Sequence, residues 1–382
     1  MPAANLSLTY LVLAIPGGSA VEKQLDAPAG TAHLLEHLLY AQNSLHRSPM
    51  DQYGGKFGLL TDRETITALL VFSPADASLA WQHIKHWWDN PVISADLLAR
   101  EKDIVMDEIN RAVGGPIQKT RARSLAELSP HSHFSRDFSG LDQRLMAIDV
   151  ETMYEWHRKI RLLGASVAAV GPVCPWEENT ECQSNRLWRP ESPRVPVKDN
   201  RRIRLAAAGL NQTLVYGLSM HAGLASDNVL GSFAAYGALA YGRIHPVQKR
   251  FHEQMRLRFL DAGLESLPSA NLFSVSALVS ESQGEEVANL VSTLLHNPEK
   301  ASTPERLHKV LLYELAKSLD CPKTHARQLA ISALCGHPSP LDLYNKAKSA
   351  THSQLNGWVQ SATRSSSVTC TLKPSAVPER LA

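Results

Sequence analysis

One helix-forming segment, residues 30–40, combines an apolar face with a polar face, and this pattern limits how the chain around it can pack. Four leucines recur at helical spacing on one side, namely Leu34, Leu35, Leu38 and Leu39. The opposite side carries His33, Glu36, His37 and Tyr40 at the spacing i, i+3, i+4, i+7. Thr31 is the expected N-cap. The helix must therefore bury its leucines in a core and reserve its polar side for another purpose.

The polar face carries residue types that are common in zinc sites. His33 and His37 lie one turn apart on a helix and project side by side. Two neutral imidazoles at this spacing can take two corners of a tetrahedral zinc site, and Glu36 is close enough to accept a proton from a zinc-bound water. The order H-x-x-E-H is the inverzincin signature. The alternative is an amphipathic helix whose histidines match the motif by chance.

A zinc site of this kind needs a third protein ligand, and a second helix offers two carboxylates. Residues 94–110 are expected to be helical, because a serine caps their start and Gly114-Gly115-Pro116 follows their end. Glu101 and Glu108 are seven residues apart, two turns along one face of this helix. Taken alone, such a pair is usually a solvated surface, so its meaning depends on where it lies relative to the histidines.

The two motifs together resemble those of the pitrilysin/insulinase family of zinc peptidases, in which H-x-x-E-H is followed by E-x6-E. The resemblance implies that His33, His37 and Glu108 hold one Zn2+ per chain. It makes Glu36 the general base that activates a water whose pKa the zinc lowers to about 7. It makes Glu101 a supporting carboxylate that orients one of the ligands.

A segment between the two motifs is also similar to a family motif. Residues 54–65 resemble the strand entry G-G-x-x-N-A-x-T-x-x-x-T, with Gly58 and Thr61 at positions expected to contact substrate. The family's Asn-Ala is Gly58-Leu59 here, which removes a polar side chain that helps to hold substrate near the zinc. Further on, residues 131–140 are similar to the H-P-x-x-R-x-x-x-G loop of the family, with Arg136 and Gly140 in step.

The C-terminal half departs from the family in a second way. Family members carry an Arg followed closely by a Tyr after a Gly-Leu, and this pair binds the scissile region of the substrate. Arg256 or Arg258 could match the Arg, but Glu265 or Ser266 stands at the Tyr position. The sequence therefore predicts a broken Arg/Tyr pair.

The broken pair bears on the partner and on the function that the resemblance implies. Single-unit family members are half-clamshells that dimerise, with the zinc domain of one subunit facing the C-terminal domain of the other. We therefore expect a heterodimer with a homologous subunit that lacks zinc ligands and supplies the Arg/Tyr pair, the alternative being a homodimer without the Tyr. The expected function is that of a zinc metallo-endopeptidase subunit acting on short or unfolded peptides, such as a leader or precursor peptide, in a dimeric chamber. The alternatives are a non-catalytic structural or scaffold subunit, or a zinc hydrolase with non-peptide substrates.

The length of 382 residues suggests two domains. The expected fold is α+β, with two similar α/β sandwich domains in tandem that form a half-clamshell, each a mainly antiparallel sheet packed with helices. The expected divisions are a zinc-binding domain at 1–173, a linker at 174–198 and a second domain at 199–382. The main strands are expected at 6–15, 65–72, 165–173, 213–218, 273–279 and 367–372. The main helices are expected at 32–40, 77–88, 94–111, 150–160, 228–241 and 247–258. By comparison with the family, one or two strands before residue 6 are expected to be missing.

Charge and hydropathy limit which classes of partner are expected, and cysteine usage indicates a cellular location. Lys and Arg number 39 and Asp and Glu 37, which gives a net charge of +2. Because the basic residues are dispersed, neither nucleic acid nor an anionic membrane is an expected partner. No apolar stretch is long enough to span a bilayer. The 5 cysteines are an odd set without tight metal-ligand spacing, which favours reduced thiols and a cytoplasmic location.

Overall fold

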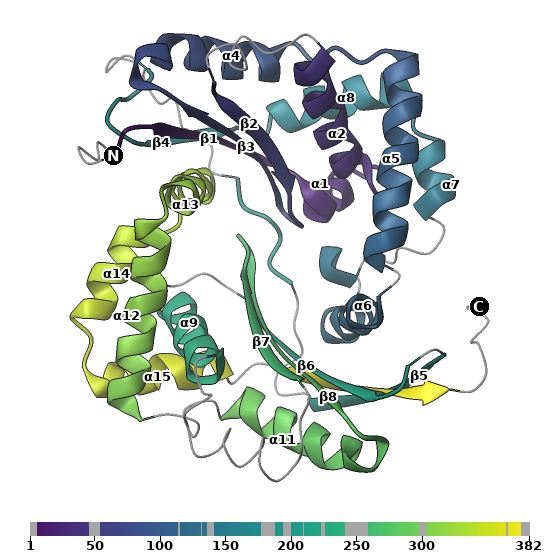
Figure 1. The fold of residues 1–382 in the computed structure, drawn as a ribbon, viewed down its shortest axis with the longest axis vertical. Coiled ribbons are helices and arrows are strands. Elements are labelled where there is room, and N and C mark those ends of the chain that lie inside the picture. Colours follow the sequence, from purple (N-terminus) through teal and green to yellow (C-terminus); the bar gives the residue numbers. More distant parts are fainter. Residues whose placement is uncertain are drawn as a thin grey trace. The chain divides into compact units, whose positions relative to one another are not determined.

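The computed structural model describes residues 6–45, 54–113, 115–130, 132–135, 141–176, 188–193, 200–208, 210–222, 226–240, 259–297, 303–363 and 366–375. The chain divides into two compact units. Unit 1 comprises Met1–Asn110, Phe138–Glu191 and Lys317–Leu341. Unit 2 comprises Arg111–Asp137, Ser192–Ala316 and Asp342–Ala382. Each unit contains one β-sheet and several helices, so the predicted α+β class is confirmed (Figure 1).

The sheet of unit 1 has the strand order β2-β3-β1-β4, and every neighbouring pair is antiparallel. Its strands are β1 (Thr9–Pro16), β2 (Lys56–Thr61), β3 (Thr65–Phe72) and β4 (Ser166–Val170). Seven of the eight residues of β1 are buried, because both faces of this strand are covered. Strand β2 lies at the edge of the sheet in the part of the chain that is described.

Helices pack on both faces of this sheet. The helices of unit 1 are α1 (Gly18–Gln24), α2 (Thr31–Leu45), α4 (Ala77–Asp89), α5 (Ala95–Val113), α7 (Leu141–Met146), α8 (Val150–Arg161) and α13 (Pro322–Cys335). Helices α2, α4 and α8 each contact strands of the sheet. Helix α13 comes from far along the chain and packs against β1, β3 and β4, on the other side of the sheet from α4 (Figure 1).

The sheet of unit 2 has the strand order β5-β9-β6-β8-β7, in which only β5 and β9 are parallel. Its strands are β5 (Asn200–Ala208), β6 (Thr213–Ala222), β7 (Phe259–Ser266), β8 (Ala270–Val279) and β9 (Ser367–Ser375). Its helices are α6 (Pro116–Leu128), α9 (Ser226–Ala240), α11 (Gly284–His296), α12 (Pro304–Asp320), α14 (Pro340–Lys348) and α15 (His352–Thr363). Along β6, Val215 packs in a cluster with residues of α11, and Tyr216 in another with residues of α6. Because successive strand residues point to opposite faces, α11 and α6 cover opposite faces of this sheet.

Most of the expected elements are present. The six expected main strands coincide with β1, β3, β4, β6, β8 and β9, within a few residues at their ends. Strands β5 and β7 were not expected, and the helix expected at 247–258 lies outside the described residues. Among the described residues, no helix combines the length and the apolarity that crossing a membrane requires.

Candidate metal centre

Helix α2 is fixed in the core of unit 1 by its apolar face. Leu34, Leu35, Leu38 and Leu39 are at most 1% exposed, which confirms the predicted apolar side. The N-terminus of the helix is held in a way that the sequence did not predict. Thr31 is the first residue of the helix and donates its hydroxyl to the carbonyl of Pro28, so it is not the N-cap. Instead, the buried Glu22 of α1 accepts a hydrogen bond of 2.8 Å from the backbone amide of Ala32.

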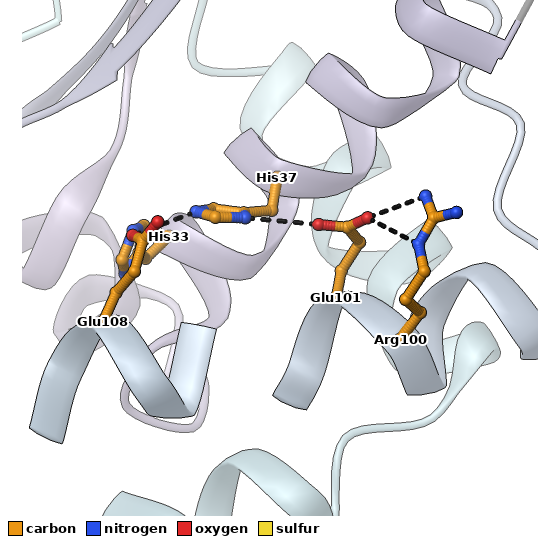
Figure 2. A network of polar contacts seen from close by, with 5 residues as sticks. All are labelled: His33, His37, Arg100, Glu101 and Glu108. Carbon is orange, nitrogen blue, oxygen red and sulfur yellow. Dashed lines mark hydrogen bonds and ion pairs between the residues drawn. The ribbon is translucent and has the colours of Figure 1, made fainter. Parts of the chain in front are cut away.

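The structure brings the three predicted metal ligands together (Figure 2). His33 and His37 project from α2 toward α5, where Glu108 faces them. One oxygen of Glu108, Oε2, lies 3.4 Å from Nε2 of His33 and 3.3 Å from Nε2 of His37. The three side chains offer ligand atoms that all lie within 4.8 Å of one another. They are the one group of metal-ligating side chains of this kind found among the described residues.

These distances fit a tetrahedral ion. Two ligand atoms that are each about 2.0–2.1 Å from a tetrahedrally bound zinc are about 3.3 Å apart. The separations from the Glu108 oxygen to the two imidazole nitrogens, 3.4 and 3.3 Å, are close to this value. Burial, together with the neighbouring His37, lowers the pKa of His33, which favours the neutral imidazole that can bind a metal. The donor set of two imidazoles and one carboxylate therefore suits a divalent cation such as zinc.

Glu101 supports the group from one side. Its Oε2 lies 3.3 Å from Nδ1 of His37, while the Nε2 of the same ring faces Glu108. Its Oε1 accepts two hydrogen bonds from the guanidinium of Arg100, of 3.1 and 2.9 Å (Figure 2). The side chain of Glu101 is only 6% exposed, whereas that of Glu108 is 49% exposed. Glu101 is thus placed to fix the ring orientation of His37, and Glu108 to meet an ion on the open side.

Glu36 is held by the edge strand β2. Its Oε2 accepts a hydrogen bond of 2.9 Å from the backbone amide of Thr61. The β2–β3 turn contains a hydrogen bond from the amide of Asp62 to the carbonyl of Thr65, so Asp62 faces β3 with its backbone groups. Because these groups alternate along an antiparallel strand, those of Thr61 point away from β3. The amide that orients Glu36 is therefore an edge group of the sheet.

Only some of the residues predicted to contact substrate belong to the described part of the chain. Gly58 lies on β2, and a Cβ added there would meet no atom within 4 Å. Arg256, Arg258, Arg136 and Gly140 lie outside the described residues. On β7, Glu265 forms an ion pair with Arg121 of α6, and the hydroxyl of Ser266 donates to the side chain of Asn271. Neither residue at the expected Tyr position supplies a phenol.

Comparison with known proteins agrees with the motif pair. Residues 5–127 match the family model described as Insulinase (Peptidase family M16). A comparison with curated proteins finds no match. The predicted resemblance to the pitrilysin/insulinase family is confirmed over residues 5–127 by this family match.

Solved structures share the fold over nearly the whole chain. A protease from Helicobacter pylori aligns with a TM-score of 0.81 at 15% identity, covering 98% of this chain and 96% of that one. A peptidase M16 inactive domain from Pseudomonas fluorescens aligns with a TM-score of 0.77 at 16% identity, covering 98% and 95%. A chain of Complex III2 from Candida albicans aligns with a TM-score of 0.74 at 12% identity, covering 98% and 92%. At these identities the likeness concerns the fold alone.

Proposed function

We propose that this chain is a zinc metallo-endopeptidase subunit that hydrolyses short or unfolded peptides. The observation that carries the proposal is the position of one Glu108 oxygen, 3.4 and 3.3 Å from the Nε2 atoms of His33 and His37. Glu36 lies on the same face of α2, and Glu101 is buried behind His37. If the histidines matched the motif by chance, there would be no reason for a second helix to place a carboxylate beside both of them.

His33, His37 and Glu108 would hold the zinc, and each residue around them has a separate task. When bound, zinc polarises the scissile carbonyl and makes a water acidic enough to ionise near neutral pH. Glu36 is the general base: the amide of Thr61 fixes its Oε2, which leaves Oε1 to accept the proton of the attacking water. The same carboxyl then gives the proton to the leaving amine. Glu101 keeps the Nδ1 proton of His37 engaged, so that Nε2 presents a lone pair.

The edge strand β2 is the proposed site for the peptide. Because backbone groups alternate along this strand, those of Phe57 and Leu59 point away from β3, as those of Thr61 do. An extended peptide can pair with such an edge as an added strand. Its backbone would run beside Glu36, since the amide of Thr61 is at the end of the same edge. Gly58 adds no side chain that would obstruct this approach.

We further propose that the active assembly is a heterodimer with a homologous subunit that lacks zinc ligands and supplies the Arg/Tyr pair. The residues at the expected Tyr position support this, because neither Glu265 nor Ser266 is a Tyr and Glu265 is engaged by Arg121. A homodimer that works without the Tyr is the alternative. Leader or precursor peptides are the proposed substrates, and a cytoplasmic location stays a prediction.

Metal content and peptide cleavage test the proposal together. The purified chain, alone and mixed with a candidate partner, is assayed for zinc and for cleavage of a library of unfolded peptides, with a chelator control. Glu36→Gln should keep one zinc per chain and lose about 100-fold or more of the cleavage rate, because only the base is removed. Glu155→Gln is the matched control, since Glu155 is an exposed residue of α8 that pairs with Lys159.

The outcomes separate the candidate functions. Cleavage that needs zinc, needs Glu36 and rises when the partner is added supports the heterodimeric peptidase. Full activity of the chain alone would contradict the heterodimer but keep the peptidase. Zinc binding without cleavage in any mixture would favour the scaffold subunit instead.

A further inference from the structure

The turn between β2 and β3 is tied to a helix that lies far away in the sequence. Arg327 of α13 donates a hydrogen bond of 2.9 Å from its guanidinium to Oδ2 of Asp62, 265 residues earlier in the chain. The pair is half-buried, with side-chain exposures of 32% and 17%. Glu36 receives its hydrogen bond from Thr61, the residue next to Asp62. We infer that Arg327 is a positioning residue for Glu36, and this inference rests on the proposed function.

Asp62 forms several of the hydrogen bonds that hold the turn together. Its Oδ1 accepts hydrogen bonds from the amides of Glu64 and Thr65, at 2.8 and 2.6 Å. Its Oδ2 accepts from the hydroxyl of Thr65 at 2.8 Å, in addition to Arg327. Its own amide donates to the carbonyl of Thr65 at 2.9 Å. The carboxylate therefore shapes the path of the backbone through the turn. Arg327 ties this carboxylate to α13, while backbone hydrogen bonds of 2.9 Å from Gly17 to Glu64 and from Ala20 to Arg63 tie the far side of the turn to the start of α1.

Helix α13 is a firm support for this contact. Ala326 and Ala330, on either side of Arg327 along the helix, are fully buried in the core of unit 1. The hydroxyl of Ser166 on β4 donates to the carbonyl of Ala330. The amide of Trp188 donates to the carbonyl of Leu334 at 3.1 Å. Because buried alanines flank Arg327 and the helix backbone after it is hydrogen-bonded to its surroundings, the guanidinium reaches the turn from a firmly packed helix.

The effect on Glu36 follows from the direction of one amide. Thr61 is the last residue of β2, and its N–H points away from β3 because the amide of the next residue, Asp62, is used in the turn. If the turn loosens, the Thr61 amide changes direction and Glu36 loses its donor. A carboxylate that can rotate is a poorer base for one defined water, although the peptide and the zinc can still bind. Arg327 should therefore influence the rate of the chemical step more than substrate affinity.

The test compares Arg327→Ala and Arg327→Lys with the wild-type full chain, in the mixture in which the wild type cleaves peptides. Arg327→Ala should lower kcat by about 10- to 100-fold with little change in KM or zinc content. Arg327→Lys keeps the positive charge and should recover part of the loss. Arg161→Ala is the matched control, because Arg161 also pairs with an aspartate of unit 1, Asp89, at 2.7 Å and on the surface.

A second measurement does not depend on activity or on zinc. Hydrogen exchange at the Thr61 amide, followed by NMR in metal-free protein, reports its bond to Glu36 directly. Arg327→Ala should speed this exchange about tenfold, as Glu36→Ala does, while Arg161→Ala leaves it unchanged. If the wild type is inactive but Arg327→Ala still speeds exchange at Thr61, the proposed function fails and the positioning role stands. Unchanged exchange and unchanged kcat in Arg327→Ala would overturn the inference, as would a kcat loss explained entirely by lost zinc.

Discussion

The α2–α5 helix pair of unit 1 and strand β7 of unit 2 stand at two motifs that the family resemblance predicts, but only the helix pair carries the expected side chains. On the helix pair, one carboxylate oxygen of Glu108 lies close to the Nε2 atoms of both His33 and His37. On β7, Glu265 or Ser266 stands at the expected Tyr position, and Glu265 forms an ion pair with Arg121. The contrast fits the proposed heterodimer, in which this chain would provide the metal ligands and a partner would provide the Arg/Tyr pair.

The largest expected effect comes from removing the shared carboxylate of the intact region. Glu108→Ala should reduce the zinc content from about one per chain to near zero, because two imidazoles alone bind zinc weakly. The measurement is metal analysis after dialysis against a weak chelator. Asp103→Ala, an exposed acid on the same helix, is the control and should retain zinc. Retention of zinc by Glu108→Ala would remove the basis of the comparison.

The next effect concerns the support behind His37. Glu101→Gln should weaken zinc affinity by about 10- to 100-fold, since the carboxylate that orients the ring is lost. Arg100→Ala should have a smaller effect, because the guanidinium contacts only the other oxygen of Glu101. Competition with a chromophoric chelator measures both. Equal affinities for wild type and Glu101→Gln would show that the packing of α2 alone orients the ring.

Acid should destabilise both units, although among the described residues only unit 1 carries the group of metal-ligating side chains. Burial lowers the pKa of His157 in unit 1 and of His221 in unit 2 to about 4. Since the pKa in the unfolded chain is about 6.5, the unfolded state binds more protons between these two values. The free energy of unfolding should therefore fall as the pH drops from about 6.5 to about 4.

Thermal unfolding at pH 7.5 and pH 5 measures this effect. The melting temperature should fall by several degrees on acidification, and His157→Gln, which can still donate to the carbonyl of Trp88, should reduce the fall. His352→Gln, an exposed change, is the control. An identical acid shift in His157→Gln would exclude this histidine as a cause.

The smallest expected effect on stability and zinc is in the altered region. Glu265→Tyr should change the free energy of unfolding by less than about 1 kcal/mol, because the ion pair with Arg121 is partly solvated. Zinc content should not change. Cleavage by the chain alone should rise, by about tenfold at most, if a phenol at this position binds the substrate. No rise in cleavage with either Glu265→Tyr or Ser266→Tyr would mean that the missing Tyr is not what distinguishes the two regions.

The features visible in the sequence are those that are local or that repeat with a helical period. The leucines of α2 and the seven-residue spacing of Glu101 and Glu108 predicted two helix faces, and the family resemblance joined them into one site. Strand β7 was not expected, because its sequence FLDAGLES does not alternate regularly between apolar and polar residues and has a glycine in its interior. Helix α13 belongs to unit 1 although it lies late in the chain, and α6 belongs to unit 2 although it lies early. No periodic pattern in the sequence predicts these assignments.

Contacts between residues far apart in the chain could not be predicted. Glu22 replaces Thr31 at the start of α2, because the preceding helix α1 brings a buried carboxylate to the free amides. Arg327 and Asp62 meet only after α13 packs on the sheet. The family resemblance predicted a substrate contact for Thr61, but only the three-dimensional structure shows that its amide donates to Glu36.

The central claim is that His33, His37 and Glu108 bind one zinc ion, and anomalous X-ray diffraction at the zinc edge tests it most directly. Crystals grown with zinc should show one anomalous peak, about 2.0–2.1 Å from both Nε2 atoms and from a Glu108 oxygen. A peak bound by other side chains, or no peak between α2 and α5 in zinc-saturated crystals, would contradict the account.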